Sequence, residues 1–256
     1  MSRIRALALL AVLGAVPAGA QEISNLESGR PVTMEDATPL APGSLSFSAD
    51  YGYARRLDNV DYAGPAFSLA GGVFAGLELG AETRLLTNPR LNARRGIGSG
   101  DLDIHLLAAV RQESGGAPAL AVRVDTFLPT GFASHGTNLS GEVIATRSFE
   151  SFRLHATLGN IYVGSTRPSQ RRNEVYGTLG FDVPAFGPWR TDTVAMADVV
   201  VRQSVLTGGN VSVGVEVGLR HRIGMHTLFY AGLTSEVAGE PDRIRYRGIL
   251  GLTHFF

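Results

Sequence analysis

The chain has 256 residues, 44% of them hydrophobic and 18% charged, with 32 Gly, 12 Pro and no Cys. This hydrophobic content and the balance of 23 basic against 23 acidic residues exclude a disordered chain, and no collagen-like or coiled-coil bias is present. A balanced charge offers no basic field for nucleic acid, and the lack of Cys excludes disulfides, thiolate metal sites and a Cys lipid anchor.

Residues 1–20 have the pattern of a secretory signal peptide. Arg3 and Arg5 form the positive end, residues 6–16 the apolar stretch, and Ala18-Gly19-Ala20 the cleavage site. The alternative is a membrane anchor, but the apolar stretch has about 11 residues where a spanning helix needs about 20. No later apolar run approaches about 18 residues, so the mature protein is expected beyond the inner membrane, soluble or inserted without helices.

From residue 43 onward, apolar and polar residues alternate. In residues 43–54, Leu45 and Phe47 alternate with Ser46 and Ser48, which is the period of a strand with one apolar face. The pattern predicts about twelve strands, each near the 9–11 residues that a tilted strand needs to cross a bilayer. Clear segments are residues 43–54, 77–85, 101–110, 120–128, 152–159, 175–183 and 211–220; less regular ones are 65–72, 139–149, 191–203, 227–234 and 243–256.

The links between these segments alternate in length. Residues 72–75, 112–118, 150–151, 184–190 and 222–226 form short links, and residues 55–61, 86–99, 129–138, 164–173, 204–210 and 236–242 form links that are longer on average. Short periplasmic turns and longer extracellular loops are typical of outer-membrane barrels with an even number of strands.

Alternation alone does not decide which face points outward, and a soluble barrel of the lipocalin type is the alternative. Three features favour the membrane: a polar face of small and ionic residues, aromatic residues near segment ends, and a C-terminal Phe256 that resembles an outer-membrane assembly signal. The aromatic residues are Tyr51, Tyr53, Phe149, Phe152, Tyr162, Phe186, Trp189, Tyr246, Phe255 and Phe256. We therefore predict an all-β, transmembrane, antiparallel up-and-down barrel over residues 44–256, in the outer membrane of a Gram-negative bacterium.

Twelve strands enclose a lumen of intermediate width. About eight strands leave room for little more than side chains, whereas 16–18 leave an aqueous channel. Residues 21–43 show no strand pattern and are expected to begin in the periplasm, either as a plug of the barrel or as a loose N-terminal tail.

A set of ionic residues is predicted on the lumen-facing side. Acids and bases fall on neighbouring strands, so they either pair across a wet wall or line a solute path. Mixed signs argue against strong selection of anions or cations. The tentative solute-path residues are Glu78, Glu82, Asp101, Asp103, His105, Arg123, Asp125, Arg153, His155, Glu216 and Arg220.

Catalytic and metal chemistry have weak support in the sequence. His155 and Thr157 share one strand face, as a base and nucleophile of a lipid hydrolase would, but nothing fixes a third member, and a hydrogen-bonded lumen histidine is the favoured interpretation. No HExxH, phosphate-binding glycine loop or EF-hand spacing is present. We expect no enzyme activity, no metal and no cofactor.

Two arginine groups fall in the predicted extracellular loops. Arginine forks suit phosphates, and lipopolysaccharide presents phosphates at that surface. The alternatives are a lipopolysaccharide contact and ordinary solvated loop charge. The residues are Arg90, Arg94, Arg95, Arg167, Arg171 and Arg172.

Three short motifs resemble an outer-membrane family named for the meta-cleavage pathway of phenol degradation. They are the opening from Leu26-Glu27-Ser28-Gly29-Arg30-Pro31 to Pro42-Gly43-Ser44-Leu45, then Gly98-Ser99-Gly100-Asp101-Leu102 and Phe127-Leu128-Pro129-Thr130-Gly131. Ser28 stands where the family usually has Thr. The resemblance implies passage of small organic compounds, aromatic ones among them, across the outer membrane.

The leading hypothesis is thus a passive outer-membrane channel for small, mostly uncharged organic solutes. A structural or surface-interaction barrel without transport is the alternative, and an outer-membrane lipid hydrolase is a distant third. The expected partners are outer-membrane lipids and lipopolysaccharide, the assembly machinery through Phe256, and the solute, but not nucleic acid.

Overall fold

The computed structural model describes residues 23, 25–56, 60–86, 98–131, 134–166, 168–187, 190–239 and 244–256. The predicted signal peptide and Arg90, Arg94, Arg95, Arg167 and Trp189 lie outside these residues. Within them, no helix is long and apolar enough to cross a membrane. The strands are β1 (Leu45–Arg56), β2 (Val60–Phe74), β3 (Leu77–Leu86), β4 (Gly98–Ser99), β5 (Leu102–Arg111), β6 (Ala119–Leu128), β7 (Asn138–Ser148), β8 (Arg153–Tyr162), β9 (Asn173–Pro184), β10 (Thr193–Arg202), β11 (Ser212–Arg222), β12 (Thr227–Ala238) and β13 (Ile244–Phe255).

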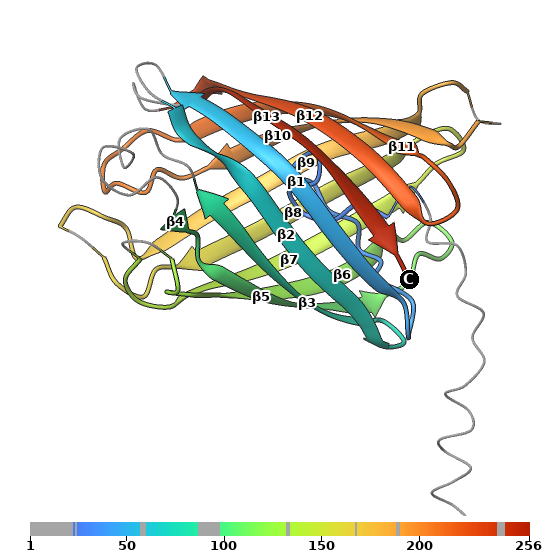
Figure 1. The fold of residues 1–256 in the computed structure, drawn as a ribbon, viewed down its shortest axis with the longest axis horizontal. Helices are drawn as coiled ribbons and strands as arrows, with labels where there is room; N and C mark the ends of the chain where they lie inside the picture. Colours follow the sequence, from blue (N-terminus) through green and yellow to red (C-terminus); the bar gives the residue numbers. More distant parts are fainter. Residues whose placement is uncertain are drawn as a thin grey trace, which may run out of the picture.

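Twelve of these strands close into one antiparallel ring (Figure 1). Each pairs with its neighbours in the sequence, and β1 pairs with both β2 and β13, so the ring has no open edge in the described chain. The two-residue strand β4 pairs only with the end of β3 and stays outside the ring. The predicted up-and-down barrel is confirmed.

The register of the pairs fixes how far the strands lean. Following the paired residues once around the ring returns to β1 about 14 residues from the starting point, which for twelve strands corresponds to a tilt of about 40°. Strands of 10 to 15 residues with this tilt are long enough to span the apolar layer of an outer membrane.

The two ends of the barrel differ as the sequence predicts. At the periplasmic end, residues 75–76, 112–118, 149–152, 185–192 and 223–226 connect the strands, and Phe256 donates its backbone N–H to the carbonyl of Leu45 at 2.8 Å. The extracellular links, which are longer on average, are residues 57–59, 87–101, 129–137, 163–172, 203–211 and 239–243.

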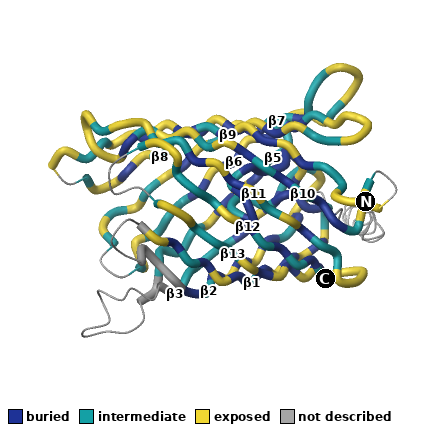
Figure 2. The backbone as a smooth tube through the Cα atoms, turned by 90° about the horizontal axis from the view of Figure 1, so that it is seen from above, coloured by how far each residue is buried: buried dark blue, intermediate teal, exposed yellow. Residues whose placement is uncertain are grey.

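Buried and exposed residues alternate along the strands (Figure 2), and the exposed rows are mostly apolar whereas the buried rows carry most of the polar residues. On β1, Phe47 is 41% exposed, whereas its neighbours Ser46 and Ser48 are 2% and 1% exposed. A soluble barrel would have the opposite arrangement, so the lipocalin-type alternative is wrong. One aromatic residue departs from the predicted outer girdle: Phe255 is 8% exposed, because it belongs to the inward row of β13 and packs in an apolar cluster with Leu228.

Residues 23 and 25–42, called the luminal segment below, lie inside the ring (Figure 1). Ile23, Leu26, Val32, Met34 and Leu40 are each at most 4% exposed and pack with inward residues of the wall. The chain then bridges from Pro42 to Gly72 and enters β1. The apolar core of this protein therefore lies at the contact between the luminal segment and the barrel wall.

The orientation of the faces predicts where a charge is tolerated. Val217, 49% exposed on the outer face of β11, is expected to lose about 2–4 kcal/mol of unfolding free energy when changed to Arg, because the guanidinium would face lipid. Urea titration in lipid vesicles, read from gel migration of folded and unfolded forms, measures this. Met225→Arg, in a periplasmic turn at 80% exposure, is the control and should change little. Equal losses at both sites would contradict the assigned faces.

Candidate functional site: the occupied lumen

The luminal segment begins with a tight turn, residues 27–30. The Arg30 N–H donates to the Glu27 carbonyl at 3.1 Å, and Gly29 has a φ of +75°, a conformation that side-chain-bearing residues rarely adopt. Glu27-Ser28-Gly29-Arg30 therefore forms a turn because glycine occupies its third position. The turn lies in the lumen, with the Arg30 side chain directed at the wall.

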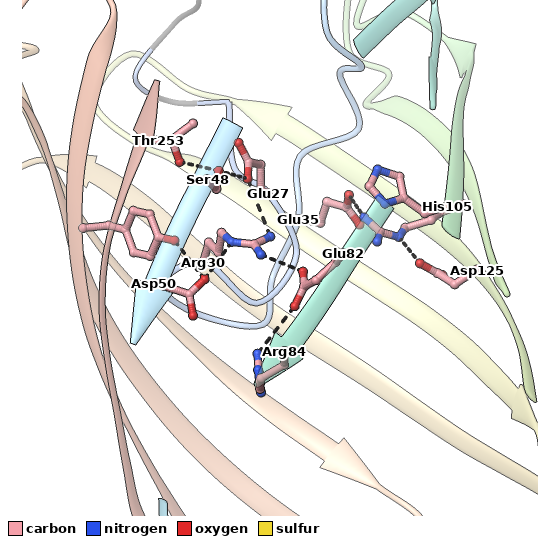
Figure 3. Close-up of polar contacts among 12 residues, drawn as sticks. Glu27, Arg30, Glu35, Ser48, Asp50, Glu82, Arg84, His105, Asp125 and Thr253 are labelled. Atoms are coloured by element: carbon pink, nitrogen blue, oxygen red, sulfur yellow. Dashed lines mark hydrogen bonds and ion pairs between the residues drawn. The ribbon is translucent and has the colours of Figure 1, made fainter. Parts of the chain in front are cut away.

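Arg30 is the centre of a buried ionic network (Figure 3). Its Nε donates to Asp50 on β1 at 3.1 Å, and its Nη2 donates to Glu82 on β3 at 2.6 Å. The Arg30 side chain is only 6% exposed, and Tyr230 also donates to Asp50, at 3.2 Å. A cation removed from water in this way is stable only with its partners in place, so Arg30 ties the segment to two strands.

Two wall glycines give the chain room beside Arg30. A Cβ on Gly218 of β11 would lie 2.5 Å from Pro31 Cγ, and one on Gly232 of β12 would lie 2.4 Å from the Pro31 carbonyl oxygen. Neither separation is possible for real atoms, so larger residues at these positions would displace the segment. The wall is thus shaped to accept Pro31.

Two wall carboxylates accept consecutive backbone N–H groups of the segment. The Thr33 N–H donates to Glu216 at 2.5 Å and the Met34 N–H donates to Asp198 at 2.7 Å. Asp198 and Glu216 are directly paired across β10 and β11, and like charges in this position repel. The two N–H donors, together with Arg247 at 2.9 Å from Glu216, offset that repulsion.

Further along the segment, two acidic side chains form ion pairs with arginines of the wall. Glu35 accepts from Arg123 Nη1 at 2.7 Å, and Arg123 also donates to Asp125 at 2.7 Å. Asp36 accepts from Arg153 Nη1 at 2.5 Å. Two backbone N–H groups complete the attachment: Ala37 donates to Thr146 at 3.0 Å and Leu40 donates to Glu78 at 2.9 Å.

The histidines of the lumen support this attachment. His105 Nε2 lies 3.2 Å from Glu78, and His155 lies between Thr146 (3.1 Å) and Asp182 (3.3 Å). His155 contacts Thr146 on the neighbouring strand, whereas the predicted partner Thr157, on the same inward face, has no hydrogen bond to His155 in the described contacts. A Thr-His-Asp chain is present, but His155 is 1% exposed beneath the luminal segment, where a lipid cannot reach it.

The remaining predicted solute-path residues also lie on the inner side. Arg220 is fully buried and donates through Nη1 to the carbonyls of Ile23, at 3.4 Å, and Asn25. Asp103 lies in the inward row of β5. Asp101 is at the extracellular rim, where it accepts from the Gly131 N–H at 3.0 Å and from Ser134 at 2.8 Å.

Sequence reasoning missed several members of the network. Asp50 and Asp182 lie on polar faces that alternation identifies, so the pattern itself could have found them. Arg30, Glu35 and Asp36 fall in a segment without periodicity, and no local signal pairs them with particular strands. Their partners depend on the path of the chain inside the barrel.

The segment packs against the wall with spaces of very different size beside it. Near Leu26, Glu78 and Leu107 the space left is about 10 Å³, roughly one water molecule. Toward the periplasmic mouth, a space of about 570 Å³ lies between residues 36–42 and the wall. Among the described residues, no group of three or more His, Asp or Glu side chains could hold a metal ion. The described lumen residues therefore bind the chain's own segment.

Two of the six loop arginines are described. Arg171 donates from its backbone to the Val205 carbonyl at 2.8 Å and from Nε to the Leu206 carbonyl at 3.2 Å, so it fastens two extracellular loops together. Arg172 lies over the ring of Tyr162, 5.9 Å from its centre. The lipopolysaccharide contact stays a prediction.

The Arg30 network can be tested through exposure of the segment. The chain has no Cys, so Met34→Cys, at a fully buried position, introduces a single thiol. We expect a water-soluble maleimide to label it about tenfold faster or more when Arg30→Gln is added, because Asp50 and Glu82 then lose their cation and the segment opens more often. Arg190→Gln, which removes an exposed ion pair with Asp192, is the matched control. Equal rates in all three backgrounds would show that Arg30 does not hold the segment.

Comparison with known proteins identifies the fold only. No protein-family model matches the chain, and neither does any curated protein. The structure is similar to the KdgM porin solved in complex with disordered oligogalacturonate, with a TM-score of 0.58 and 10% identity over 82% of this chain and 99% of that one. It is also similar to the NanC porin, with a TM-score of 0.58 and 9% identity over 82% of this chain and 98% of that one. The chain thus has the fold of an outer-membrane β-barrel.

Proposed function

We propose that this protein is an outer-membrane channel for small organic solutes that its luminal segment holds closed. One observation carries the proposal: a ring of twelve strands encloses more space than its wall side chains fill, and a separate part of the chain occupies that space. A barrel needed only as a membrane anchor or scaffold could be narrower. When the luminal segment moves out of the ring, the space that it leaves can pass a small solute.

The chemistry of the wall supports a lumen that can be wetted. The groups that hold the segment are carboxylates, guanidinium groups, imidazoles and hydroxyls, such as Glu78, Arg153 and Thr146. Water can replace each of these hydrogen bonds when the segment leaves. An inner wall of this kind would stay hydrated, as in channels whose lumen is lined by charged side chains.

The solute class follows from the mixture of charges and from the resemblance seen in the sequence. The inner wall carries acids and arginines together, as in the pairs Arg123–Asp125 and Arg153–Asp182, so neither anions nor cations meet a wall of a single opposing sign. The resemblance to the family of the phenol meta-pathway makes small aromatic compounds the first candidates. The similar solved barrels are called porins, which agrees with a pore of this fold.

The closed lumen also favours a second candidate, a structural or surface-interaction barrel without transport. Beside Leu26 and Leu107 the space between the segment and the wall is only about 10 Å³, too small for a solute larger than one water molecule. The two candidates differ in one respect: a channel must open when the segment is displaced, whereas a structural barrel has no need to conduct.

Removing the segment separates them. We expect deletion of residues 23–40 to give steady conductance steps in planar bilayers and uptake of neutral phenolic compounds into liposomes, with an open fraction at least about tenfold above that of the full chain. The full chain should open briefly and rarely. A deletion variant that folds but stays sealed would establish the structural alternative.

A second variant covers the case in which the deletion fails to fold. Arg30→Gln, Glu35→Gln and Asp36→Asn together remove the ion pairs to Asp50, Arg123 and Arg153, the two acid-to-amide changes without change of shape, so the open fraction should also rise. Arg190→Gln with Asp192→Asn removes an exposed pair of the same type and should leave conductance unchanged.

A further inference from the structure

Three extracellular loops line a pocket that is separate from the space filled by the luminal segment. Described residues from the loops around His135, Ser165 and Leu206 surround a space of about 440 Å³, within the usual range for small-molecule sites. It lies at the extracellular end, away from the luminal segment. The described contacts of that segment are with the wall and involve none of the pocket residues.

Backbone contacts hold the three loops in a defined arrangement. Arg171 and Thr207 donate their N–H groups to the carbonyls of Val205 and Ser169, at 2.8 and 2.7 Å, which joins two loops as a short ribbon. Gly164 donates to the Asn138 side chain at 3.1 Å, and a Cβ on Gly164 would lie 2.1 Å from the Thr137 carbonyl oxygen. This close approach of two backbones requires glycine, so the pocket depends on built contacts between loops.

The described lining residues include both polar and apolar side chains, and none of those described is an acid or an arginine. Hydrogen-bonding groups come from His135, Asn138, Ser165 and Gln170. Apolar surface comes mainly from Val205 and Leu206, which are 47% and 46% exposed although they lie in an extracellular loop. Exposed apolar side chains beside uncharged polar ones suit an uncharged molecule with one apolar face and a hydroxyl or carbonyl group.

Two of the lining residues continue inward-facing rows of the wall. Asn138 begins the inward row of β7, in which Ser140 and Glu142 follow, and buried Val163 continues the inward row of β8. Ser140 and Glu142 both contact the hydroxyl of Tyr176 on β9. The inward row that begins at Asn138 thus leads to Tyr176 and, at Glu142, to the strand position paired with Arg123.

We propose that this pocket is a capture site for a neutral organic molecule of one or two rings that carries a hydroxyl or carbonyl group. The apolar part would pack on Val205 and Leu206, and the polar group would bond to Ser165 or His135. The proposal rests on the proposed function only in that the captured molecule is the solute of the channel. A charged analogue would have to leave water with no acid or arginine among the described lining residues to pair with it.

The test uses 4-fluorophenol as the probe, observed by fluorine NMR with the full chain in lipid nanodiscs and with empty nanodiscs as the blank. Phenols titrate near pH 10, so the probe is neutral at pH 7. We expect saturable binding that weakens at least about tenfold in Ser165→Trp, which fills the pocket, and in Leu206→Asn, which removes apolar surface. Ser151→Trp, in an exposed periplasmic turn, is the matched control and should bind as the unchanged chain does.

A second probe separates neutral from charged ligands. We expect 4-fluorobenzoate, of similar size but anionic, to bind at least about tenfold more weakly than 4-fluorophenol. Absence of saturable binding, binding unchanged in both pocket variants, or equal binding of the two probes would each overturn the capture site. These outcomes are distinct from failure of the channel: a barrel that binds 4-fluorophenol in this pocket but never conducts after deletion of residues 23–40 keeps the site and loses the transport function.

Discussion

The structure depends on the ion pairs and hydrogen bonds that neutralise the charged side chains inside the barrel. A membrane barrel must turn its apolar side chains to lipid, so its charges gather in the lumen, where they need water or one another. Here the luminal segment supplies much of what the wall lacks. It brings a guanidinium to Asp50 and Glu82, two carboxylates to Arg123 and Arg153, and backbone N–H groups to four further wall groups. The lumen is filled because the charges of the segment and the wall are complementary.

This mode of attachment has a consequence for stability. Buried ion pairs contribute little net stability once the cost of their desolvation is included, whereas each buried apolar side chain adds a hydrophobic contribution. The segment buries apolar residues such as Leu26 and Met34, which oppose its release. In the proposed channel, a ligand would shift the balance between closed and open forms by its differential affinity for the two.

The sequence predicted the barrel well because a single period repeats in it twelve times. Each strand, its inward face and the alternation of short and long links follow from that period, including the inward position of Arg123 and Glu216. The placement of residues 23–42 could not be predicted in the same way, because a segment without a period is positioned by individual partners far away in the chain. Met34, for example, contacts a residue 164 positions later. Likewise, the two-residue strand β4 pairs with the end of β3, and two residues are too few to show an alternating pattern in the sequence.

The three short motifs singled out in the sequence coincide with places where distant parts of this chain contact one another. The first forms the turn that directs Arg30 at the wall, with Gly29 at a positive φ. The second and third meet at the extracellular rim, where the Asp101 carboxylate accepts the Gly131 N–H and a Cβ on Gly131 would lie 2.6 Å from that carboxylate. Strand residues can exchange one apolar side chain for another, because lipid makes no specific contact, but a tight turn or a close backbone approach restricts the residue more strongly. The motifs therefore mark two constrained contacts, the turn that directs Arg30 at the wall inside the lumen and the Asp101–Gly131 contact at the extracellular rim. The alternating strands connect these two sites.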